Sequence, residues 1–572
     1  FYLIIKTLMF EHALFLGYLY VLLFSVIGHG LLFYNLIDRN LLNFNLGYHG
    51  IIGFFSIIFI SIITSFFTKH GYIHNVVLHA VGLASFVYHF ITTKNLKIKD
   101  DTVKLILTSL VFLLAMYIFK THDDFPYYHL TYTQNLSENK FIIGTGLFSH
   151  GFRTFSSLFY FNSVLYLPFV ELYLFHLGPF FILLFFNFIL LKKIYEYIRK
   201  NQNDIIFFFT LLSFIFVNVA FYRISEHGTD RSAQILLLLI FIITLECLFN
   251  FDEKKIEINL KILLVLVFLA ASLKAIYFIY LILIPFVLFK INKLEYILKI
   301  IKSRLIILLS IFFILNSSIN ILSTGCILYP AKITCFENFE WSIKKKEVAQ
   351  MKTHYEWWAK GGGGPNYSHK LSKDEYVKNF NWISNWIDRH FFNKVSDTLL
   401  GILTISLITF LIFKSKKIKK KERKKLNLLY LLIFIFLIEW FLNHPAMRYG
   451  GYVLFAIPIF LFTSSILEKY EVSKKKLYNS GIFLIILTLI LFNFRNIIRI
   501  NKEIGFYSYK IKESPFYFIP KIDNKIIFEN DNIRIYYPTN GMCWNVKTPC
   551  SYRSNIKSKN KFSFNIISID DK

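Results

Sequence analysis

Two adjacent aspartates stand at the start of the first long polar segment of the chain. Asp123 and Asp124 follow an apolar run at 104–119 and are flanked by aromatic residues within 121–129 (THDDFPYYH). A carboxylate near a bilayer carries a desolvation cost, so it usually marks a function or a pairing partner. Such a group can act as a general base that deprotonates an acceptor hydroxyl as the hydroxyl attacks the sugar of a donor lipid. The alternative is a helix end whose aspartates are merely hydrated.

Other charged side chains sit beside apolar runs and are candidates for binding a substrate. Glu226, Asp230 and Arg231 share a short charged segment, in which an acid would orient an acceptor and the arginine would contact phosphate. Lys274 lies at the junction of two apolar runs and needs an anionic partner, either a lipid phosphate or a carboxylate such as Glu226. Arg448 offers a planar guanidinium that suits phosphate oxygens. The alternatives are a local ion pair in the charged segment and anchoring of helices at headgroup level. The residues assigned to substrate binding are His129, Arg153, Glu226, Asp230, Lys274 and Arg448.

The spacing of the remaining polar groups predicts neither a metal site nor a cofactor. The histidines of the polar segments show no His-x3-His or Glu-x-x-His spacing of the kind that places metal ligands on one helix. The glycines at 361–364 lack the GxGxxG and GxxxxGK[ST] patterns of phosphate-binding loops, so we interpret them as a hinge. We expect no cofactor, and no spacing supports a divalent metal.

Four of the five cysteines form two close pairs in polar segments, Cys326 with Cys335 and Cys543 with Cys550, whereas Cys247 falls in an apolar run. Disulfides persist in oxidising compartments, and pairing of neighbours is the simplest of the three connectivities. A four-cysteine zinc site is the alternative, but neither pair has the short gap that such sites use. We predict two local disulfides.

Long apolar runs must position these groups. Hydrophobic residues make up 55% of the 572-residue chain, with 66 phenylalanines and a mean hydropathy of +0.49. A helix that crosses a bilayer needs about 20 mostly apolar residues, and the runs do not alternate as barrel strands would. We therefore predict an all-α polytopic membrane protein with about 14 transmembrane helices. The apolar runs are 12–35, 50–67, 73–93, 104–119, 175–195, 205–221, 233–250, 260–272, 276–290, 304–321, 397–413, 426–442, 451–467 and 480–496.

Charge indicates which ends of these runs face the cytoplasm. Lysines cluster in short links such as 414–425 (KSKKIKKKERKK), and such links stay cytoplasmic under the positive-inside rule. The net charge of +28 therefore indicates topology, and we expect no nucleic-acid partner. Threading the runs alternately leaves the long segments 120–174, 322–396 and 497–572 on the opposite side. We expect a bacterial inner (plasma) membrane protein whose large loops and C-terminus are extracytoplasmic.

The runs and loops divide the chain into five parts. Within 120–174 we expect residues 155–173 to form an amphipathic helix in the membrane interface, because charge placement leaves no room for another crossing. We expect the tail to be a small mixed α/β segment. The parts are N-terminal transmembrane helices (1–103), a transmembrane core with the first large external loop (104–321), a disulfide-containing external loop (322–396), C-terminal transmembrane helices (397–496) and an extracytoplasmic tail (497–572).

This arrangement resembles the GT-C glycosyltransferases. The likeness rests on three stretches, namely 122–129 (HDDFPYYH), the block from Gly325 through Cys335 to Trp341, and 444–450 (HPAMRYG). It places the chain closest to an uncharacterised bacterial family of GT-C-like membrane proteins. GT-C enzymes transfer sugars from polyprenyl-phosphate donors outside the cytoplasm, with an aspartate of the external loop as catalytic base in an inverting transfer. The resemblance therefore implies that Asp123 or Asp124 is the base and that a glycan, lipid or protein is the acceptor in cell-envelope glycan assembly. One departure is that three apolar runs precede the run that leads to the aspartates, whereas GT-C enzymes usually carry them after the first.

Two other functions fit a polytopic membrane protein. A transporter or flippase would show paired halves with polar residues midway through broken helices. The sequence shows no convincing internal repeat, and its acidic candidates cluster at one face. A surface-polysaccharide polymerase or ligase would use the same kind of donor in the same compartment, although it would rely on external arginine and histidine.

Overall fold

Helices make up most of the chain in the computed structural model, which describes residues 2–37, 45–92, 96–249, 253–291, 295–364, 367–418 and 426–570. Within these ranges nine helices are long and apolar enough to cross a membrane, as expected of a multi-pass membrane protein. They are Phe10–Asn35, Leu46–Ser65, Tyr72–Thr92, Leu172–Arg199, Thr229–Phe249, Lys255–Leu273, Arg304–Thr324, Ile383–Phe413 and Lys474–Tyr507. The shorter apolar helices are Ile205–Ala220, Ala275–Lys290, Asn427–Asn443 and Gly451–Leu467. Part of the lysine-rich link, residues 419–425, lies outside the described residues.

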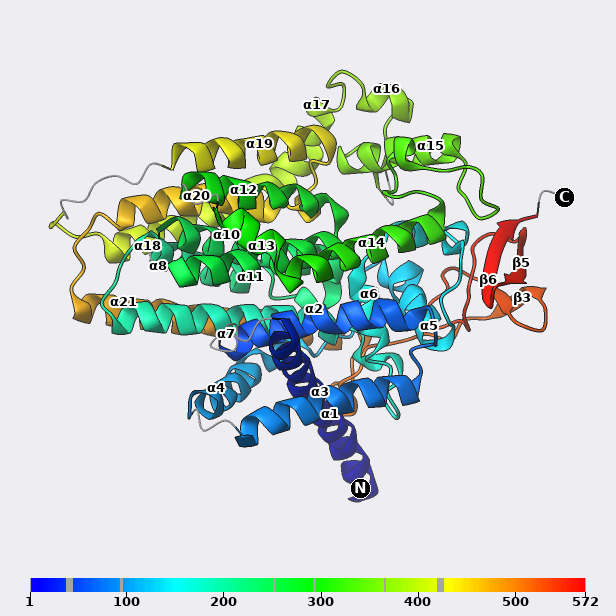
Figure 1. Ribbon diagram of the computed structural model, residues 1–572, viewed down its shortest axis with the longest axis horizontal. Helices are drawn as coiled ribbons and strands as arrows, with labels where there is room; N and C mark the ends of the chain where they lie inside the picture. The colour runs from blue at the N-terminus through cyan, green and yellow to red at the C-terminus, as the bar shows by residue number, and fades with distance from the viewer. Residues whose placement is uncertain are drawn as a thin grey trace.

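Most of the long helices run side by side along the long axis of the molecule, while α1 crosses them at an angle (Figure 1). The first half contains α1 (Tyr2–Ile37), α2 (Leu46–Ser65), α3 (Tyr72–Thr92), α4 (Leu96–Phe112), α5 (Leu130–Glu138), α6 (Ser157–Ser163), α7 (Leu177–Arg199), α8 (Ile205–Ala220), α9 (Ile224–His227), α10 (Thr229–Phe249), α11 (Glu253–Leu273) and α12 (Leu283–Lys290). The second half contains α13 (Glu295–Ile301), α14 (Arg304–Thr324), α15 (Lys345–Ala359), α16 (Lys373–Val377), α17 (Ile383–Trp386), α18 (Ser396–Phe413), α19 (Asn427–Asn443), α20 (Gly451–Leu467) and α21 (Lys474–Tyr507). The short helical turns are η2 (Leu113–Ala115), η3 (Phe125–His129), η4 (Thr145–Leu147), η5 (His150–Arg153), η6 (Leu172–Leu174), η7 (Ala275–Ile282), η8 (Lys332–Thr334), η9 (Ile387–Val395) and η10 (Met447–Tyr449).

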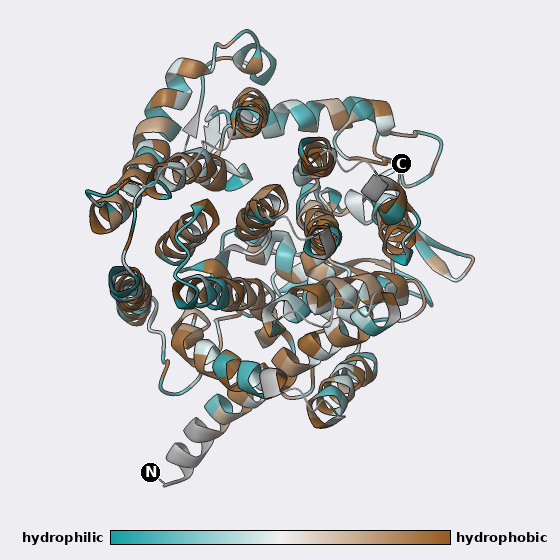
Figure 2. Cartoon of the chain, turned by 60° about the vertical axis from the view of Figure 1, so that its left-hand side comes forward, coloured by the Kyte–Doolittle hydropathy of each residue, from teal (hydrophilic) through white to brown (hydrophobic). Residues whose placement is uncertain are grey.

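Hydrophobic residues make up most of the length of these helices (Figure 2). The spans that contain α7 and α10 are almost wholly buried, whereas those of α14, α18 and α21 are mostly exposed. A helix that is apolar all round is either enclosed by other helices or faces lipid. The α7 and α10 spans therefore form the centre of the bundle, and α14, α18 and α21 present apolar surface outward.

The strands among the described residues form three two-stranded antiparallel sheets. They pair β1 (Gly363–Gly364) with β2 (Tyr367–Ser368), β3 (Asn524–Glu529) with β4 (Arg534–Pro538), and β5 (Ile556–Lys561) with β6 (Phe564–Ile569). The last two hairpins lie at one end of the bundle, together with α5, α6 and α15 (Figure 1). Backbone contacts join the segments there, because Ile143 pairs with Ile566 and the Gly144 N–H donates to the Leu322 carbonyl at 2.7 Å. We call this end, with segments 120–174 and 325–395 and the C-terminal hairpins, the loop end.

Two local predictions about the first loop are wrong. The run 104–119 is not one helix leading to the aspartates, because α4 ends at Phe112 and only the turn η2 follows. Arg499 of α21 donates to the carbonyls of Leu114 and Tyr117 at 3.0 and 2.7 Å, so these carbonyls bind a guanidinium in place of helical N–H groups. Likewise, 155–173 holds no interfacial helix. Its one α-helix, α6, has all seven residues buried, and it packs on α2 and α5.

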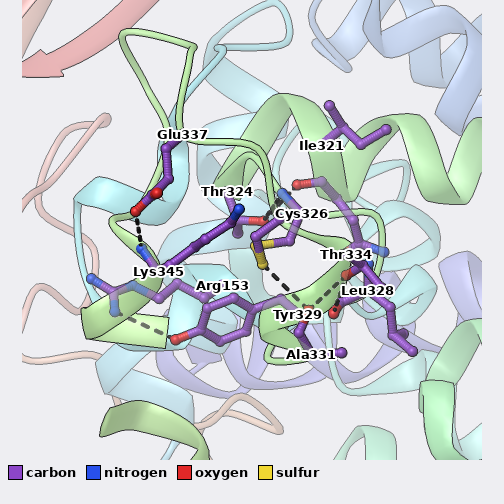
Figure 3. The surroundings of a disulfide bond; sticks show 12 residues. Arg153, Ile321, Thr324, Cys326, Leu328, Tyr329, Ala331, Thr334, Glu337 and Lys345 are labelled. Atoms are coloured by element: carbon purple, nitrogen blue, oxygen red, sulfur yellow. Dashed lines mark hydrogen bonds between the residues drawn. A yellow bond between two sulfur atoms is a disulfide. The ribbon is translucent and has the colours of Figure 1, made fainter. Parts of the chain in front are cut away.

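Both predicted disulfides are confirmed. Cys326 bonds to Cys335 and Cys543 bonds to Cys550, while Cys247 is a buried free thiol in α10. The first disulfide lies beside Tyr329 and Arg153, which connect it to the first loop (Figure 3). The second lies in the tail, where the backbone N–H of Trp544 donates to the Pro126 carbonyl at 3.0 Å. Each disulfide therefore braces a segment of the loop end.

Candidate functional site

Four charged side chains from distant parts of the sequence meet at the loop end. Asp230 lies between two cations, since its Oδ1 is 2.5 Å from Lys274 Nζ and its Oδ2 is 3.6 Å from Arg448 Nε. Asp124 faces the other side of the same guanidinium, with Oδ2 at 3.7 Å from Arg448 Nη1. We call Asp124, Asp230, Lys274 and Arg448 the four-charge cluster. All four were predicted as site residues from sequence, and the structure brings them together.

The local backbone fixes both carboxylates of the cluster. Asp124 directly precedes the π-helical turn η3, and its carbonyl accepts the N–H groups of Tyr128 and His129 at 3.1 and 3.3 Å. Its own N–H donates to His122 Nδ1 at 3.1 Å. Asp230 lies in the first turn of α10, where the unpaired N–H groups of a helix favour a negative charge.

Lys274 sits where the chain changes helix, as its place between two apolar runs predicted. It separates α11 from the turn η7 and has an extended backbone, with φ −151° and ψ 110°. Its ammonium lies 4.7 Å from the ring centroid of Tyr449 in addition to its contact with Asp230. Asp230, and not Glu226, is therefore its carboxylate partner.

The loop that carries Arg448 is held rigidly from three sides. Its backbone carbonyls accept from Trp386 Nε1 (at Pro445, 2.7 Å), Trp440 Nε1 (at Ala446, 3.2 Å) and Gln234 Nε2 (at Arg448, 3.0 Å). Gly450 then turns the chain into α20 with φ 109°, a conformation that suits glycine. A backbone fixed in this way positions the Arg448 side chain between the two aspartates.

The guanidinium of Arg448 does not use all of its N–H donors in hydrogen bonds to the described residues. Its distances of 3.6 and 3.7 Å to the two aspartates are ion pairs but are too long for good hydrogen bonds. Nη2 donates to the Tyr449 hydroxyl at 3.1 Å, while Nε is buried and has no hydrogen-bond partner among the described residues. The side chain as a whole is 40% exposed. A buried donor without a partner is costly, so the geometry favours a ligand with acceptor oxygens at this point.

Two histidines adjoin the cluster in the neutral state. His122 Nδ1 lies 3.6 Å from Asp124 Oδ2, and the rings of His122 and His129 stack with centroids 6.3 Å apart. Burial lowers the pKa of both imidazoles, to about 4 for His129, although Asp124 acts in the opposite direction. Neutral imidazoles can accept or donate a hydrogen bond near Asp124 without adding charge.

The low pKa of His129 predicts how stability depends on pH. Between pH 6.5 and about 4 the unfolded chain holds a proton that the folded chain lacks, so stability is full above this window and falls as pH drops through it. We expect thermal unfolding in detergent to show this fall, to which His129 contributes at most about 3 kcal/mol alongside other buried histidines such as His70, whose pKa burial lowers to about 3. His129→Gln should make the fall shallower by that amount, because glutamine takes up no proton in this pH range. An unaltered slope in His129→Gln would contradict the assignment.

The other predicted aspartate takes no part in the cluster. Asp123 is exposed and makes no hydrogen bond or ion pair with any residue that the structure describes. Its carboxylate acts to raise the pKa of His122, as the last of the causes that act on that imidazole. Of the two aspartates that the sequence left as alternatives, Asp124 is therefore the one placed for chemistry.

Glu226 belongs to a separate, buried ion network. Its carboxylate accepts from Arg223 at 2.8 and 2.5 Å and lies 3.9 Å from Arg499. Arg499 also binds Glu503 at 2.9 Å, and Glu503 accepts the backbone N–H of Phe119 at 2.8 Å. Burial raises the pKa of Glu226, against the effect of Arg223. This network ties α9 and α21 to the segment before Asp124, so it supports the site from outside.

Arg153 also lies apart from the cluster. The buried guanidinium donates to the Tyr329 hydroxyl at 3.4 Å (Figure 3). It also donates to the Gly146 carbonyl at 2.9 Å and to Glu347 Oε1 at 2.6 Å. Arg553 of the tail donates to the same Glu347 oxygen at 2.5 Å. Although burial acts to raise it, the two arginines hold the pKa of Glu347 below its usual value. We therefore assign Arg153 to joining the first loop, the second loop and the tail.

Sequence reasoning missed two residues that complete the site. Tyr449 contacts both cations, and Gln234 holds the Arg448 carbonyl. Gln234 is four residues after Asp230 in an otherwise apolar helix, so the i, i+4 spacing of two polar groups was the available signal. Across the described ranges, no group of three or more His, Cys, Asp or Glu side chains is placed to hold a metal ion.

The chain belongs to the family described as Domain of unknown function (DUF8201), whose model matches residues 13–455. That range includes the whole four-charge cluster and the Cys326–Cys335 disulfide and ends before the C-terminal hairpins. No curated protein and no solved structure matches the chain.

Proposed function

We propose that this protein is a membrane glycosyltransferase that moves a sugar from a polyprenyl-phosphate-linked donor to an acceptor hydroxyl. The observation that carries the proposal is the Arg448 guanidinium, which lies between Asp124 and Asp230 with unused donors. A base beside a phosphate-binding cation is what transfer from a phosphorylated sugar requires. The GT-C resemblance of the segment around Asp124 points to the same chemistry.

The chemistry assigns a role to each member of the cluster. The oxygen of the acceptor hydroxyl bonds to the anomeric carbon of the sugar, and Asp124 accepts the proton that this hydroxyl loses. The bond between that carbon and the phosphate oxygen breaks, and the lipid phosphate leaves with the electron pair. Arg448 binds the phosphate oxygens and stabilises the charge that develops on them. Because the hydroxyl attacks from the side opposite to the leaving phosphate, the anomeric configuration inverts.

Asp230 and Lys274 affect the bound phosphate indirectly. Asp230 acts through its ion pair with Arg448, and Lys274 acts through its contacts with Asp230 and Tyr449. Asp230 holds Arg448 from one side, and Lys274 neutralises Asp230 at 2.5 Å. The four groups carry two charges of each sign, so an arriving phosphate makes the site net negative unless Asp124 takes up a proton. Proton transfer to Asp124 in the reaction relieves that imbalance.

The same proposal includes a topology. In this topology we count as fourteen spans the nine long apolar helices of the described residues, the four shorter ones and α4, which is the most polar of them. We place the loop end outside the cytoplasm of a bacterial inner (plasma) membrane, because the positive-inside rule keeps lysine-rich links of the sequence such as 414–425 on the cytoplasmic side. The acceptor is then a glycan, lipid or protein of the cell envelope.

Reconstitution into proteoliposomes tests the function. We expect the protein, given a polyprenyl-phosphate sugar and envelope acceptors, to release polyprenyl phosphate together with a glycosylated product detected by mass spectrometry. A labelled lipid or solute that crosses the membrane with no covalent product would instead show a transporter or flippase. Chain elongation of a lipid-linked glycan, with no single-sugar transfer, would show a polymerase.

A further inference from the structure

An apolar groove of about 530 Å³ runs along the outside of the bundle between α8, α18 and α21. It is separate from the four-charge cluster, and no residue discussed above lines it. On α18 it extends from Asp397 to Thr409, which is about 18 Å of helix. One leaflet of a bilayer contributes about 15 Å of hydrocarbon, so the groove matches the depth of a single leaflet.

The lining of the groove suits a hydrocarbon chain. Its three threonines, Thr404, Thr409 and Thr488, each donate their hydroxyl to a carbonyl of their own helix, so these donors need no partner in the groove. Gly401 widens the groove, because no atom lies within 4 Å of the position that a Cβ would take there. The groove is thus apolar over its length and charged only at one end.

That end carries one cation and one anion. Arg495 follows Leu491 of the groove by one turn of α21, and its Nη1 donates to the carbonyl of Val219, another lining residue. Its guanidinium stacks 4.0 Å from the ring centroid of Tyr222, and it forms no ion pair within the part of the chain that the structure describes. Asp397 lies at the same end, exposed in the first turn of α18.

We propose that this groove binds one chain of phosphatidylethanolamine from the surrounding bilayer, with its phosphate on Arg495 and its primary ammonium on Asp397. A cation and an anion at one mouth complement a headgroup that carries both charges. An ammonium with N–H donors can hydrogen-bond a carboxylate, which a trimethylated headgroup cannot do. The inference needs only a bilayer and does not rest on the proposed transferase activity.

The buried network around Arg499 argues that this lipid is not the sugar donor. Arg499 lies one turn beyond Arg495 on α21, and its ion pairs with Glu226 and Glu503 are buried. These side chains lie between the mouth of the groove and the segment that leads to Asp124. A headgroup on Arg495 is therefore separated from the reacting groups.

Native mass spectrometry tests the proposal. The full chain is reconstituted in equal parts of phosphatidylethanolamine, phosphatidylcholine and phosphatidylglycerol, and the lipids that it retains in mild detergent are counted. We expect one tightly held phosphatidylethanolamine in the wild type. Gly401→Leu, which fills the groove, and Arg495→Gln should each lower its occupancy about tenfold. Asp397→Asn should abolish the preference over phosphatidylcholine.

The matched control is Gly17→Leu, which adds the same side chain to α1 at another position with open space around it. We expect it to retain the lipid as the wild type does. The proposal would be overturned if Gly401→Leu retained the lipid as the wild type does, or if Gly17→Leu lost as much of it as Gly401→Leu. It would also be overturned if the wild type retained all three lipids equally. Displacement of the phosphatidylethanolamine by polyprenyl phosphate at equal concentration would also overturn it, because the groove would then belong to the donor.

Discussion

Asp124→Asn should lower the rate of sugar transfer by about 10²- to 10⁴-fold, the usual contribution of a general base. Asparagine has nearly the same shape as aspartate, so the turn η3 and the contact with His122 should persist while the proton acceptor is lost. The loss should fall on kcat, with the KM for the lipid donor little changed, because Arg448 still binds the phosphate. Steady-state kinetics in proteoliposomes measure both constants.

Asp123→Asn is the matched control, because it makes the same change one residue away on an exposed side chain without hydrogen bonds or ion pairs among the described residues. We expect it to keep kcat within about twofold. A protein inactivated by Asp123→Asn but not by Asp124→Asn would show that the wrong carboxylate was chosen. If both variants keep full activity, neither aspartate is the base.

Arg499→Met should destabilise the protein by about 3–5 kcal/mol, the range found when one partner of a buried ion pair is removed. The change leaves Glu503 buried without a countercharge and removes two hydrogen bonds to the carbonyls of Leu114 and Tyr117. Methionine fills much of the space of the arginine side chain, so the loss is mainly electrostatic. Thermal unfolding in detergent measures the effect as a lowered melting temperature.

The double variant Arg499→Met/Glu503→Gln should recover part of that stability, because it removes the uncompensated charge. Lys510→Gln is the surface control, since Lys510 and Glu513 form an exposed pair at 3.4 Å that contributes about 0–1 kcal/mol. A melting temperature for Arg499→Met as close to the wild type as that of Lys510→Gln would contradict a supporting role for the network.

Much of the site could be predicted from sequence because a charged side chain beside an apolar run costs desolvation free energy. Such a side chain usually has a pairing partner or a function. That argument selected Asp124, Asp230, Lys274 and Arg448 individually, and short spacing predicted the disulfides. It did not predict which partner each charge takes. Lys274 pairs with Asp230, whereas Glu226, only four residues earlier, pairs with Arg223. The i, i+3 spacing of Arg223 and Glu226 is a local signal for their ion pair, as the alternative of a local ion pair in the charged segment indicated. Nothing in the sequence near Lys274 indicates Asp230 as its partner, because the two residues lie on different helices.

Hydropathy also failed where buried polar groups shape the backbone. The run 104–119 is apolar throughout most of its length, yet the helix ends at Phe112, because Arg499, nearly 400 residues later, binds the carbonyls beyond it. Residues 155–173 were expected at the membrane surface because the placement of charges left no room for another crossing. Inside the bundle, part of this segment bonds to a neighbouring helix, as when Ser157 Oγ bonds to Ser272 Oγ at 2.7 Å.

The binding of a lipid phosphate to Arg448 tests the central claim most directly. Polyprenyl phosphate without sugar is titrated into detergent-solubilised wild type and Arg448→Gln, with Arg304→Gln of α14 as a control for unspecific attraction. We expect Arg448→Gln to bind about 10- to 100-fold more weakly, as the loss of hydrogen bonds to a charged group implies, and the control to bind as the wild type does. Equal affinity in all three proteins would mean that the guanidinium between Asp124 and Asp230 holds no lipid phosphate.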